Sequence, residues 1–472
     1  MHAARFAILL AGLATCATAR ADRLYAHGFE VPSIDPPFPL VEGRYQLGNG
    51  PAATQLEWVL SELATGETTT PAEVAGHFDP SWSIPVPETQ AFFQTLRTSF
   101  ADAVVTDVIA VTPVQLTVVI DTPGSGAPHG YLNLNVRYTG ERGIVQFGVS
   151  NFGGQVQYPE DQTLDMAQAV AKFHTLSGSP ALLVGRIGAN GQCSAVASDA
   201  AAELRATASI FKTWVLGGVA NAVAQGLLAT DDPIPLVAAE LAPGGTINTE
   251  PLGTPFPVDD LAILMMGISD NTATDLLHED VGRERIGQFI DDTAADPSVL
   301  RPLLGISEQF HVFRSFPLDV ALAYVNGTEA YQQQFLEEEI EPLGPLVDGP
   351  YNHVELLTRG TWQASPLDVC AAFSRLRRLP HGSDALAMVE RALGAGVAQP
   401  DVRARWDRAW YKGGSLASGA GFHVLTHAWM LEDRGDDPWV VVAMSNSDGG
   451  GIDAYKVQSI TSRILQLVAE SR

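Results

Sequence analysis

Lysine is nearly absent from this chain of 472 residues. The 28 basic residues include only four lysines, at positions 172, 212, 412 and 456, and all the others are arginines. With 54 acidic residues, the formal net charge is −26. This balance offers no basic stripe for a phosphate backbone, and no lysine stands in the Gly-Lys-Ser/Thr setting of a P-loop. We therefore expect no nucleic-acid partner, no P-loop enzyme and no polybasic membrane contact.

Long apolar runs are also scarce, and the run near the N-terminus is too short to span a bilayer. Residues 6–19 follow Arg5 and lead into an Ala-Arg-Ala tripeptide that ends at Ala21. A membrane-spanning helix needs about 20 apolar residues. The pattern predicts a secretory signal peptide over residues 1–21, cleaved before Asp22, with a buried N-terminal helix as the alternative. We expect a secreted or periplasmic protein without a membrane span.

Cysteine is rare, with three in the chain. Cys16 follows the apolar run and leaves lipoprotein anchoring as an alternative, although Thr15 fits poorly before a lipidated cysteine. The mature chain retains Cys193 and Cys370. In an oxidising compartment these two could form a disulfide. Free cysteine is a common core residue, however, and we favour two buried free thiols.

Apolar periodicity predicts an α+β domain over residues 22–155. Helical spacing or helix-start signals occur in residues 55–63, 70–73 and 90–100. Period-two alternation then follows in four segments between residues 104 and 149. Helices followed by an antiparallel meander are typical of the α+β class.

A second α+β domain is predicted over residues 160–472. Two strands flank an Asn-Gly turn at residues 190–191, and helical segments extend over 201–393. Three strands return between residues 409 and 445, before a terminal amphipathic helix over 452–469. We expect the two ends of this domain to form one antiparallel sheet flanked by helices, with a helical subdomain between them.

Ser209 and Lys212 form an S-x-x-K tetrad at the start of an apolar helix. At spacing i, i+3 the hydroxyl and the amine share one helix face. A serine hydroxyl is a weak nucleophile and needs an adjacent base, and a lysine amine can serve when burial lowers its pKa. The tetrad alone is a weak signal, because so short a motif also arises by chance.

Two further motifs carry compatible chemistry. Ser269 and Asn271 belong to an S-D-N tripeptide, whose hydroxyl can relay a proton and whose amide can orient a lysine and a substrate carbonyl. A helix N-cap is the alternative interpretation. Lys412 begins K-G-G-S, where Gly414 permits close approach to the backbone and the Ser415 N–H can donate to an oxyanion. An ordinary hairpin turn is the alternative there.

The order S-x-x-K, S-D-N, K-G-G-S resembles the signature set of the serine β-lactamase and penicillin-binding protein superfamily. This resemblance implies a β-lactamase/transpeptidase-like fold for the second domain. It also implies one role for each motif residue: nucleophile for Ser209, base for Lys212, proton relay for Ser269, orientation for Asn271, and carboxylate binding for Lys412 and Ser415.

The chain departs from that pattern at two places. Class A enzymes carry a deacylating glutamate about 36 residues after the S-D-N serine, in a Glu-x-x-Leu-Asn setting. Here that position falls near Gly305, and Glu308 is the nearest candidate, without a following Leu-Asn. Gly413 also replaces the usual threonine of the third motif. Efficient β-lactamase turnover is therefore in doubt.

The two-domain layout is similar to that of the β-lactamase-like protein of clavulanic acid biosynthesis, whose first domain looks like a steroid-isomerase cone. That resemblance implies a steroid-isomerase-like fold for residues 22–155. It also implies that Tyr411 and Phe422 line the site as aromatic walls, with ordinary strand packing as an equally weighted alternative.

We expect no cofactor and no metal. His278 lacks the second histidine of a zincin helix, and His423 and His427 have no third ligand nearby. The function indicated is a monomeric, secreted serine hydrolase that acylates Ser209 with a β-lactam or a small carboxylate-bearing ester or amide. A peptidoglycan D,D-peptidase and a non-turning-over binding protein are the alternatives.

Overall fold

The computed structural model describes residues 38–472 apart from 42–43, 49, 123, 125–128, 151–155, 157 and 350. The expected signal peptide and Cys16 lie outside the described residues. Within the described part of the chain, no helix has both the length and the apolar character that a membrane crossing requires.

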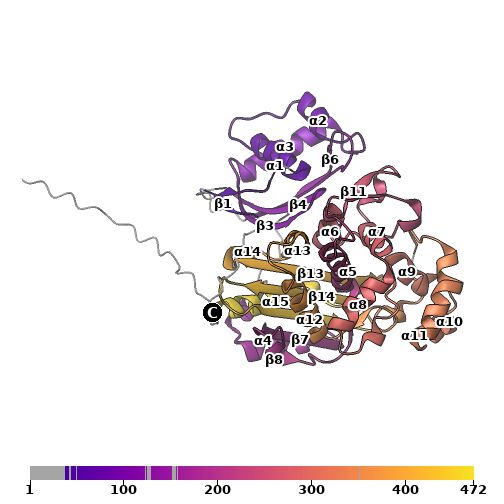
Figure 1. Ribbon diagram of the computed structural model, residues 1–472. Helices are drawn as coiled ribbons and strands as arrows, with labels where there is room; N and C mark the ends of the chain where they lie inside the picture. Colours follow the sequence, from indigo (N-terminus) through magenta and orange to yellow (C-terminus); the bar gives the residue numbers. More distant parts are fainter. Residues whose placement is uncertain are drawn as a thin grey trace, which may run out of the picture.

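The N-terminal part is a four-stranded antiparallel sheet covered on one face by three helices (Figure 1). One apolar cluster joins the helices to the strands through residues such as Leu56, Phe93 and Leu132. Thr70 and Glu73 form the predicted capping box at the start of α2. The elements are β1 (Leu40–Val41), β2 (Arg44–Tyr45), α1 (Pro51–Glu62), α2 (Pro71–His77), α3 (Val86–Phe100), β3 (Val104–Val111), β4 (Gln115–Asp121), β5 (Gly130–Val136) and β6 (Ile144–Ser150).

A five-stranded antiparallel sheet forms the centre of the second part, as predicted from its two ends. Its order is β13-β14-β15-β7-β8, so the C-terminal strands pair with the first hairpin through β15 and β7. The strands are β7 (Ser179–Ile187), β8 (Cys193–Asp199), β13 (Arg408–Ser418), β14 (Gly421–Glu432) and β15 (Trp439–Asn446).

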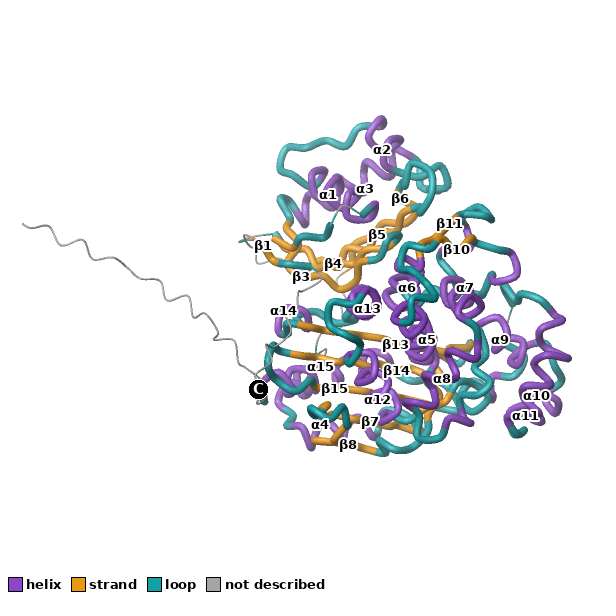
Figure 2. The backbone as a smooth tube through the Cα atoms, viewed as in Figure 1, coloured by secondary structure: helices purple, strands orange, loops and turns teal. Residues whose placement is uncertain are grey.

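Helices cover both faces of this sheet (Figure 2). Alternate residues of β7 separate the two faces: Leu182 belongs to the cluster of α4 and α15, and Leu183 to the cluster of α5 and α12. The sheet-covering elements are α4 (Met166–His174), α5 (Lys212–Ala224), α12 (Pro366–Arg377), α13 (Asp384–Gly394) and α15 (Ala454–Glu470).

Several of the predicted helical segments between the strands pack around α5. A Cβ atom at Gly217 would lie 2.2 Å from the Phe289 ring, so α8 can approach α5 this closely only because that position has no side chain. The remaining elements are α6 (Val258–Gly267), α7 (Asn271–Val281), α8 (Arg283–Thr293), α9 (Ile306–Arg314), α10 (Leu318–Val325), α11 (Glu329–Phe335), α14 (Val402–Arg405) and the short strand pairs β9 (Arg205–Ala206) with β12 (Gln363–Ala364) and β10 (Pro233–Pro235) with β11 (Pro255–Pro257). The α+β fold class is confirmed.

Cys193 and Cys370 form a disulfide, with their Cα atoms 6.3 Å apart. Our preference for two free thiols is therefore wrong. Cys193 begins β8, the edge strand of the sheet, and Cys370 lies in α12, which packs on that sheet. The hairpin of β7 and β8 brings the two residues together although 177 positions separate them in the chain.

Candidate active site

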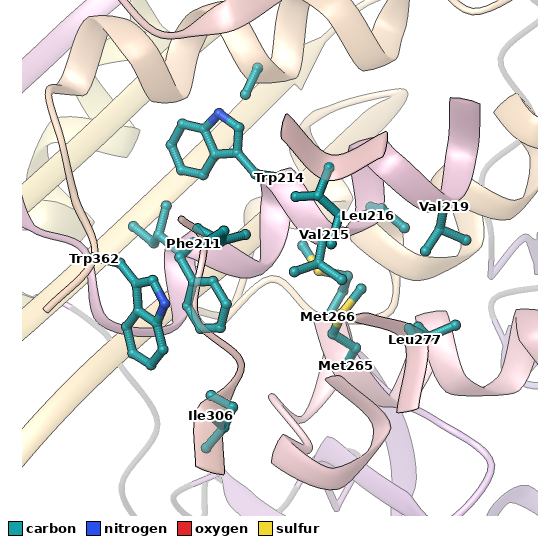
Figure 3. Close-up of a cluster of buried hydrophobic side chains, with 14 of the residues drawn as sticks. Phe211, Trp214, Val215, Leu216, Val219, Met265, Met266, Leu277, Ile306 and Trp362 are labelled. Atoms are coloured by element: carbon teal, nitrogen blue, oxygen red, sulfur yellow. The ribbon is translucent and has the colours of Figure 1, made fainter. Parts of the chain in front are cut away.

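Ser209 lies in a 3-10 turn, Ala208–Phe211, that leads directly into α5. Ala208 has a φ of 44°, a conformation that non-glycine residues keep only where the surroundings fix it. The fixing contacts come from Thr207, whose N–H donates to the Trp362 carbonyl at 3.0 Å. The Trp362 ring stacks on Phe211 at 3.8 Å between centroids (Figure 3). Trp362 therefore contacts the turn that carries Ser209 through both its backbone carbonyl and its ring.

Lys212 is the first residue of α5 and is fully buried. Its Nζ donates to the Ser269 carbonyl at 2.7 Å, to the Ser269 hydroxyl at 3.1 Å and to Asn271 Oδ1 at 2.6 Å. Burial lowers the pKa of Lys212 to about 7, and the Asp270 and Asp275 carboxylates oppose that shift. An amine with a pKa near neutrality is suited to act as a general base.

Lys412 reaches the same hydroxyl from the third motif. Its Nζ donates to Ser269 Oγ at 3.0 Å and to the Gly413 carbonyl at 2.6 Å. Burial, and then the nearby Lys212, hold the pKa of Lys412 well below its ordinary value. Ser269 itself has a φ of 61°, a second strained non-glycine position at the site. The structure therefore brings all three motifs together around one hydroxyl.

Asp270, the central residue of the S-D-N tripeptide, has a supporting role that our sequence reasoning missed. Its buried carboxylate caps α7 by accepting from Ala273 N at 2.8 Å, and it also accepts from Thr246 N at 2.5 Å and Ile247 N at 3.0 Å. Burial raises the pKa of Asp270. Helix capping, our alternative interpretation of this tripeptide, thus applies to Asp270, while the residues on either side of it contact the lysines.

Gly414 brings strand β13 into contact with the nucleophile turn. A Cβ atom at this position would lie 2.5 Å from the Ser209 nitrogen and 2.7 Å from the Thr207 carbonyl oxygen. Thr426 on the neighbouring strand donates to the same Thr207 oxygen at 2.8 Å. The backbone leading to Ser415 therefore lies beside the Ser209 amide, as an oxyanion hole made of these two amides requires.

Tyr411 and Phe422 do not lie with the lysines. Both pack against the apolar cluster of α4 and α15, and the Tyr411 hydroxyl is 2.8 Å from His427 Nδ1. A Cβ atom at Gly413 would lie 2.1 Å from the Tyr411 hydroxyl, which explains why glycine replaces threonine there. Tyr411 and Phe422 therefore show the strand packing that we held as the alternative. Tyr411 and Lys412 are neighbours on one strand, so their side chains point to opposite faces.

Glu308 and the candidate histidines have other partners. Glu308 pairs with Arg283 at 2.8 Å and accepts from Gly305 N at 2.7 Å at the start of α9. Burial raises the pKa of Glu308, but Arg283, His278 and the Gly305 amide together keep that pKa below its usual value. His423 contacts Ser418 at 2.8 Å. Among the described residues, no group of three or more His, Cys, Asp or Glu side chains is arranged to hold a metal ion.

Comparisons with known proteins agree with the motifs. The model of a β-lactamase enzyme family matches residues 190–322, which contain S-x-x-K and S-D-N. No curated protein matches. Three solved structures are similar to 65% of this chain. One is a β-lactamase from Chitinophaga pinensis, with 15% identity, 98% of that chain covered and a TM-score of 0.44. The others are a β-lactamase from Sphaerobacter thermophilus (18% identity, 98% of that chain covered, TM-score 0.42) and a protein called PBP-A (14% identity, 97% of that chain covered, TM-score 0.40). The family match covers the part of the chain that carries these two motifs and supports its resemblance to the serine β-lactamase and penicillin-binding protein superfamily.

Proposed function

We propose that this protein is an exported serine hydrolase that forms an acyl-enzyme on Ser209. The observation that carries the proposal is the state of Lys212: a buried amine one helical turn from Ser209, hydrogen-bonded inside the S-D-N loop, with a pKa of about 7. About half of such amines are neutral at pH 7 and can accept a proton. An apolar or permanently charged side chain at that position would not serve as a base.

We propose the following acylation step. The neutral Lys212 amine takes the hydroxyl proton of Ser209 as the oxygen attacks the substrate carbonyl carbon. The Ser209 and Ser415 amides stabilise the oxyanion. When the tetrahedral intermediate collapses, the bond to the leaving nitrogen or oxygen breaks, and Ser269 donates its hydroxyl proton to that atom. The Lys212 ammonium then returns a proton to Ser269, and the serine ester remains.

We assign the substrate to small esters, amides or β-lactams that carry a carboxylate. Lys412 supports this choice. Within the described part of the chain, its buried Nζ has only Ser269 Oγ and the Gly413 carbonyl as hydrogen-bond partners and no carboxylate beside it. A substrate carboxylate would stabilise the ammonium form of Lys412 and raise its depressed pKa. Elsewhere the strongly acidic chain repels anions, so a local positive site is needed to hold one.

Slow deacylation is part of the proposal. Glu308, the residue nearest to the class A deacylation position, is bound to Arg283 and to the Gly305 amide. Its contacts favour a capping role over activation of water. A long-lived acyl-enzyme would also be compatible with a peptidoglycan D,D-peptidase or a capture protein, which are the second candidates.

Export and domain organisation complete the proposal. The disulfide of Cys193 and Cys370 supports an oxidising compartment, which agrees with the expected cleavage after Ala21. We assign residues 22–155 to a steroid-isomerase-like domain and residues 160–472 to the catalytic domain of a monomer.

The decisive experiment is the intact mass of the protein after exposure to a chromogenic cephalosporin. We expect an acyl adduct that Ser209→Ala abolishes and that Ser194→Ala, a change at an exposed serine of β8, retains. Colour without a lasting adduct would indicate fast deacylation and overturn the slow step. If neither colour nor adduct forms, the β-lactam assignment fails, and p-nitrophenyl esters of carboxylate-bearing acids test the ester class.

A further inference from the structure

We propose that the N-terminal domain positions the S-D-N loop of the catalytic site, and that Glu250 is the positioning residue through which it acts. This inference deepens the proposed function and rests on it. Figure 1 shows the N-terminal sheet lying against the end of the second domain that carries α6 and β11. Two separate contacts link this sheet to segments on either side of the loop.

The first contact is the carboxylate of Glu250. This side chain is buried, with 7% of its surface exposed. It accepts from Tyr138 N at 2.9 Å, from Thr139 N at 3.2 Å and from the Thr139 hydroxyl at 2.5 Å. The Tyr138 hydroxyl adds a 2.7 Å bond to Asp260 in α6. Two residues that follow β5 are therefore fastened to the second domain by charge-assisted hydrogen bonds, which are the stronger kind.

Glu250 ends a short segment that supports the loop directly. Within this segment, the backbone N–H groups of Thr246 and Ile247 donate to the carboxylate of Asp270 at 2.5 and 3.0 Å. The hydroxyl of Thr272, beyond the loop, also accepts from Ala242 N at 3.0 Å. Glu250 is only three residues from Ile247, so a displacement of Glu250 would be passed to Asp270 through this short stretch of backbone.

The second contact lies on the other side of the loop. Helix α6 ends at Gly267, two residues before Ser269. A Cβ atom at Gly267 would lie 2.7 Å from Thr112 Cγ2 of the N-terminal domain and 2.9 Å from Ala395 Cβ. Thr112 directly follows β3, whose last residue donates from Val111 N to the Ala395 carbonyl at 2.8 Å. The end of α6 is thus enclosed between the two domains.

The two contacts between the domains support the S-D-N loop, whose backbone is strained at Ser269. Ser269 has a φ of 61°, and a non-glycine residue keeps such a conformation only where its surroundings over-determine it. The same loop covers Nζ of Lys212 and supplies its acceptors. Loosening the support would admit water to that amine and weaken the geometry of proton transfer.

The test compares Glu250→Gln with Asp107→Asn. Each change replaces with an amide a carboxylate that joins the two domains. Asp107 makes its own contact between the domains by accepting from Asp401 N at 2.6 Å. Within the described part of the chain, the hydrogen bonds of the Asp107 carboxylate are to Val108 N and Asp401 N, and none is to the segment that supports the loop. The readouts are the rate of Ser209 acylation by a chromogenic cephalosporin between pH 5 and 9, and hydrogen exchange of the peptide spanning residues 264–275.

For Glu250→Gln we expect acylation at pH 7 to slow about tenfold, the usual scale of coupling between distant sites. The midpoint of the pH profile should rise, since water around Lys212 moves its pKa back towards the ordinary value. The variant leaves unchanged the titratable groups that interact with the Lys212 amine, which are Asp270, Asp275 and Lys412. The 264–275 peptide should exchange faster. Asp107→Asn should lower the melting temperature and leave the acylation rate, the midpoint of its pH profile and the exchange of this peptide as in the wild type.

Equal behaviour of the two variants would overturn the proposal, because the interface would then provide stability alone. If no probe acylates the wild type, the proposed function fails. Hydrogen exchange then still tests whether Glu250 positions the loop. Faster exchange in Glu250→Gln alone would support that role, and unchanged exchange would overturn it.

Discussion

Lys212 and Lys412 donate hydrogen bonds to the same atom, the hydroxyl oxygen of Ser269, at 3.1 and 3.0 Å. Two buried amines this close cannot both carry a proton without a large cost, because burial and like charge each disfavour the ammonium form. Both pKa values are accordingly depressed. A shared acceptor between two such amines gives a proton a short route among Lys212, Ser269 and Lys412, which is what a base and a relay need.

Replacing Lys212 with arginine tests whether this amine is the base. A guanidinium stays charged near neutral pH and cannot accept the Ser209 proton. We expect Lys212→Arg to lower the acylation rate by at least about 100-fold, the range attributed to general base catalysis. Stopped-flow acylation and adduct mass measure the effect. Normal acylation in this variant would contradict the mechanism.

The acylation rate should depend on pH through the neutral amine. Because the pKa of Lys212 is about 7, the rate should rise with pH and reach a plateau above that value. Below it the ammonium form dominates, and the rate should fall about tenfold per unit of pH. Asp275, whose pKa burial also raises to about 7, titrates in the same window and should broaden the transition. A rate that is flat between pH 5 and 9 would exclude a base of this kind.

The motif residues could be predicted from sequence because each set is local in the chain. Ser209 and Lys212 are one helical turn apart, and Ser269 and Asn271 flank a single residue. The supporting contacts could not be predicted in this way. Asp270 meets Thr246 from 24 positions away, and Glu250 meets Tyr138 N from 112 positions away. Such pairings follow from the packing of separate elements and leave no local pattern.

Strand periodicity contained a signal that could have decided between the two interpretations of Tyr411. Tyr411 precedes Lys412 on a strand, and alternation alone places the two side chains on opposite faces. The resemblance left an aromatic wall and ordinary strand packing equally weighted, and the structure follows the alternation. The disulfide is the opposite case, because nothing local in the sequence shows that β8 lies under Cys370 of α12.

Gly414→Ala should separate β13 from the nucleophile turn. The new Cβ would meet two backbone atoms, Ser209 N at 2.5 Å and Thr207 O at 2.7 Å, and neither can move alone. We expect a loss of acylation of at least about 100-fold, the scale of an oxyanion-hole donor. Gly413→Ala is the matched control, since its Cβ meets the Tyr411 side chain. The control should cost about 1–3 kcal/mol of stability and retain more activity. Equal activities of the two variants would contradict the assignment.

Glu308→Gln tests the remaining candidate for deacylation. This carboxylate pairs with Arg283 and caps α9 through Gly305 N. We expect the variant to lose about 1–3 kcal/mol of stability, as when a hydrogen-bonded charge is removed. The lifetime of the Ser209 adduct, followed by intact mass, should remain that of the wild type. A clearly longer lifetime would identify Glu308 as the deacylation base, and Glu284→Gln at an exposed position of α8 is the control.

Breaking the disulfide should destabilise the second domain without changing its site. The bond joins β8 to α12 across 177 positions of chain, and closing a loop of that length stabilises a protein by up to about 5 kcal/mol through the unfolded state. We expect the Cys193→Ala, Cys370→Ala double variant to unfold at lower urea concentration than the oxidised wild type. Reductant should lower the midpoint of the wild type towards that of the variant and leave the variant unchanged. Coincident unfolding curves with and without reductant would show that this pair does not stabilise the fold.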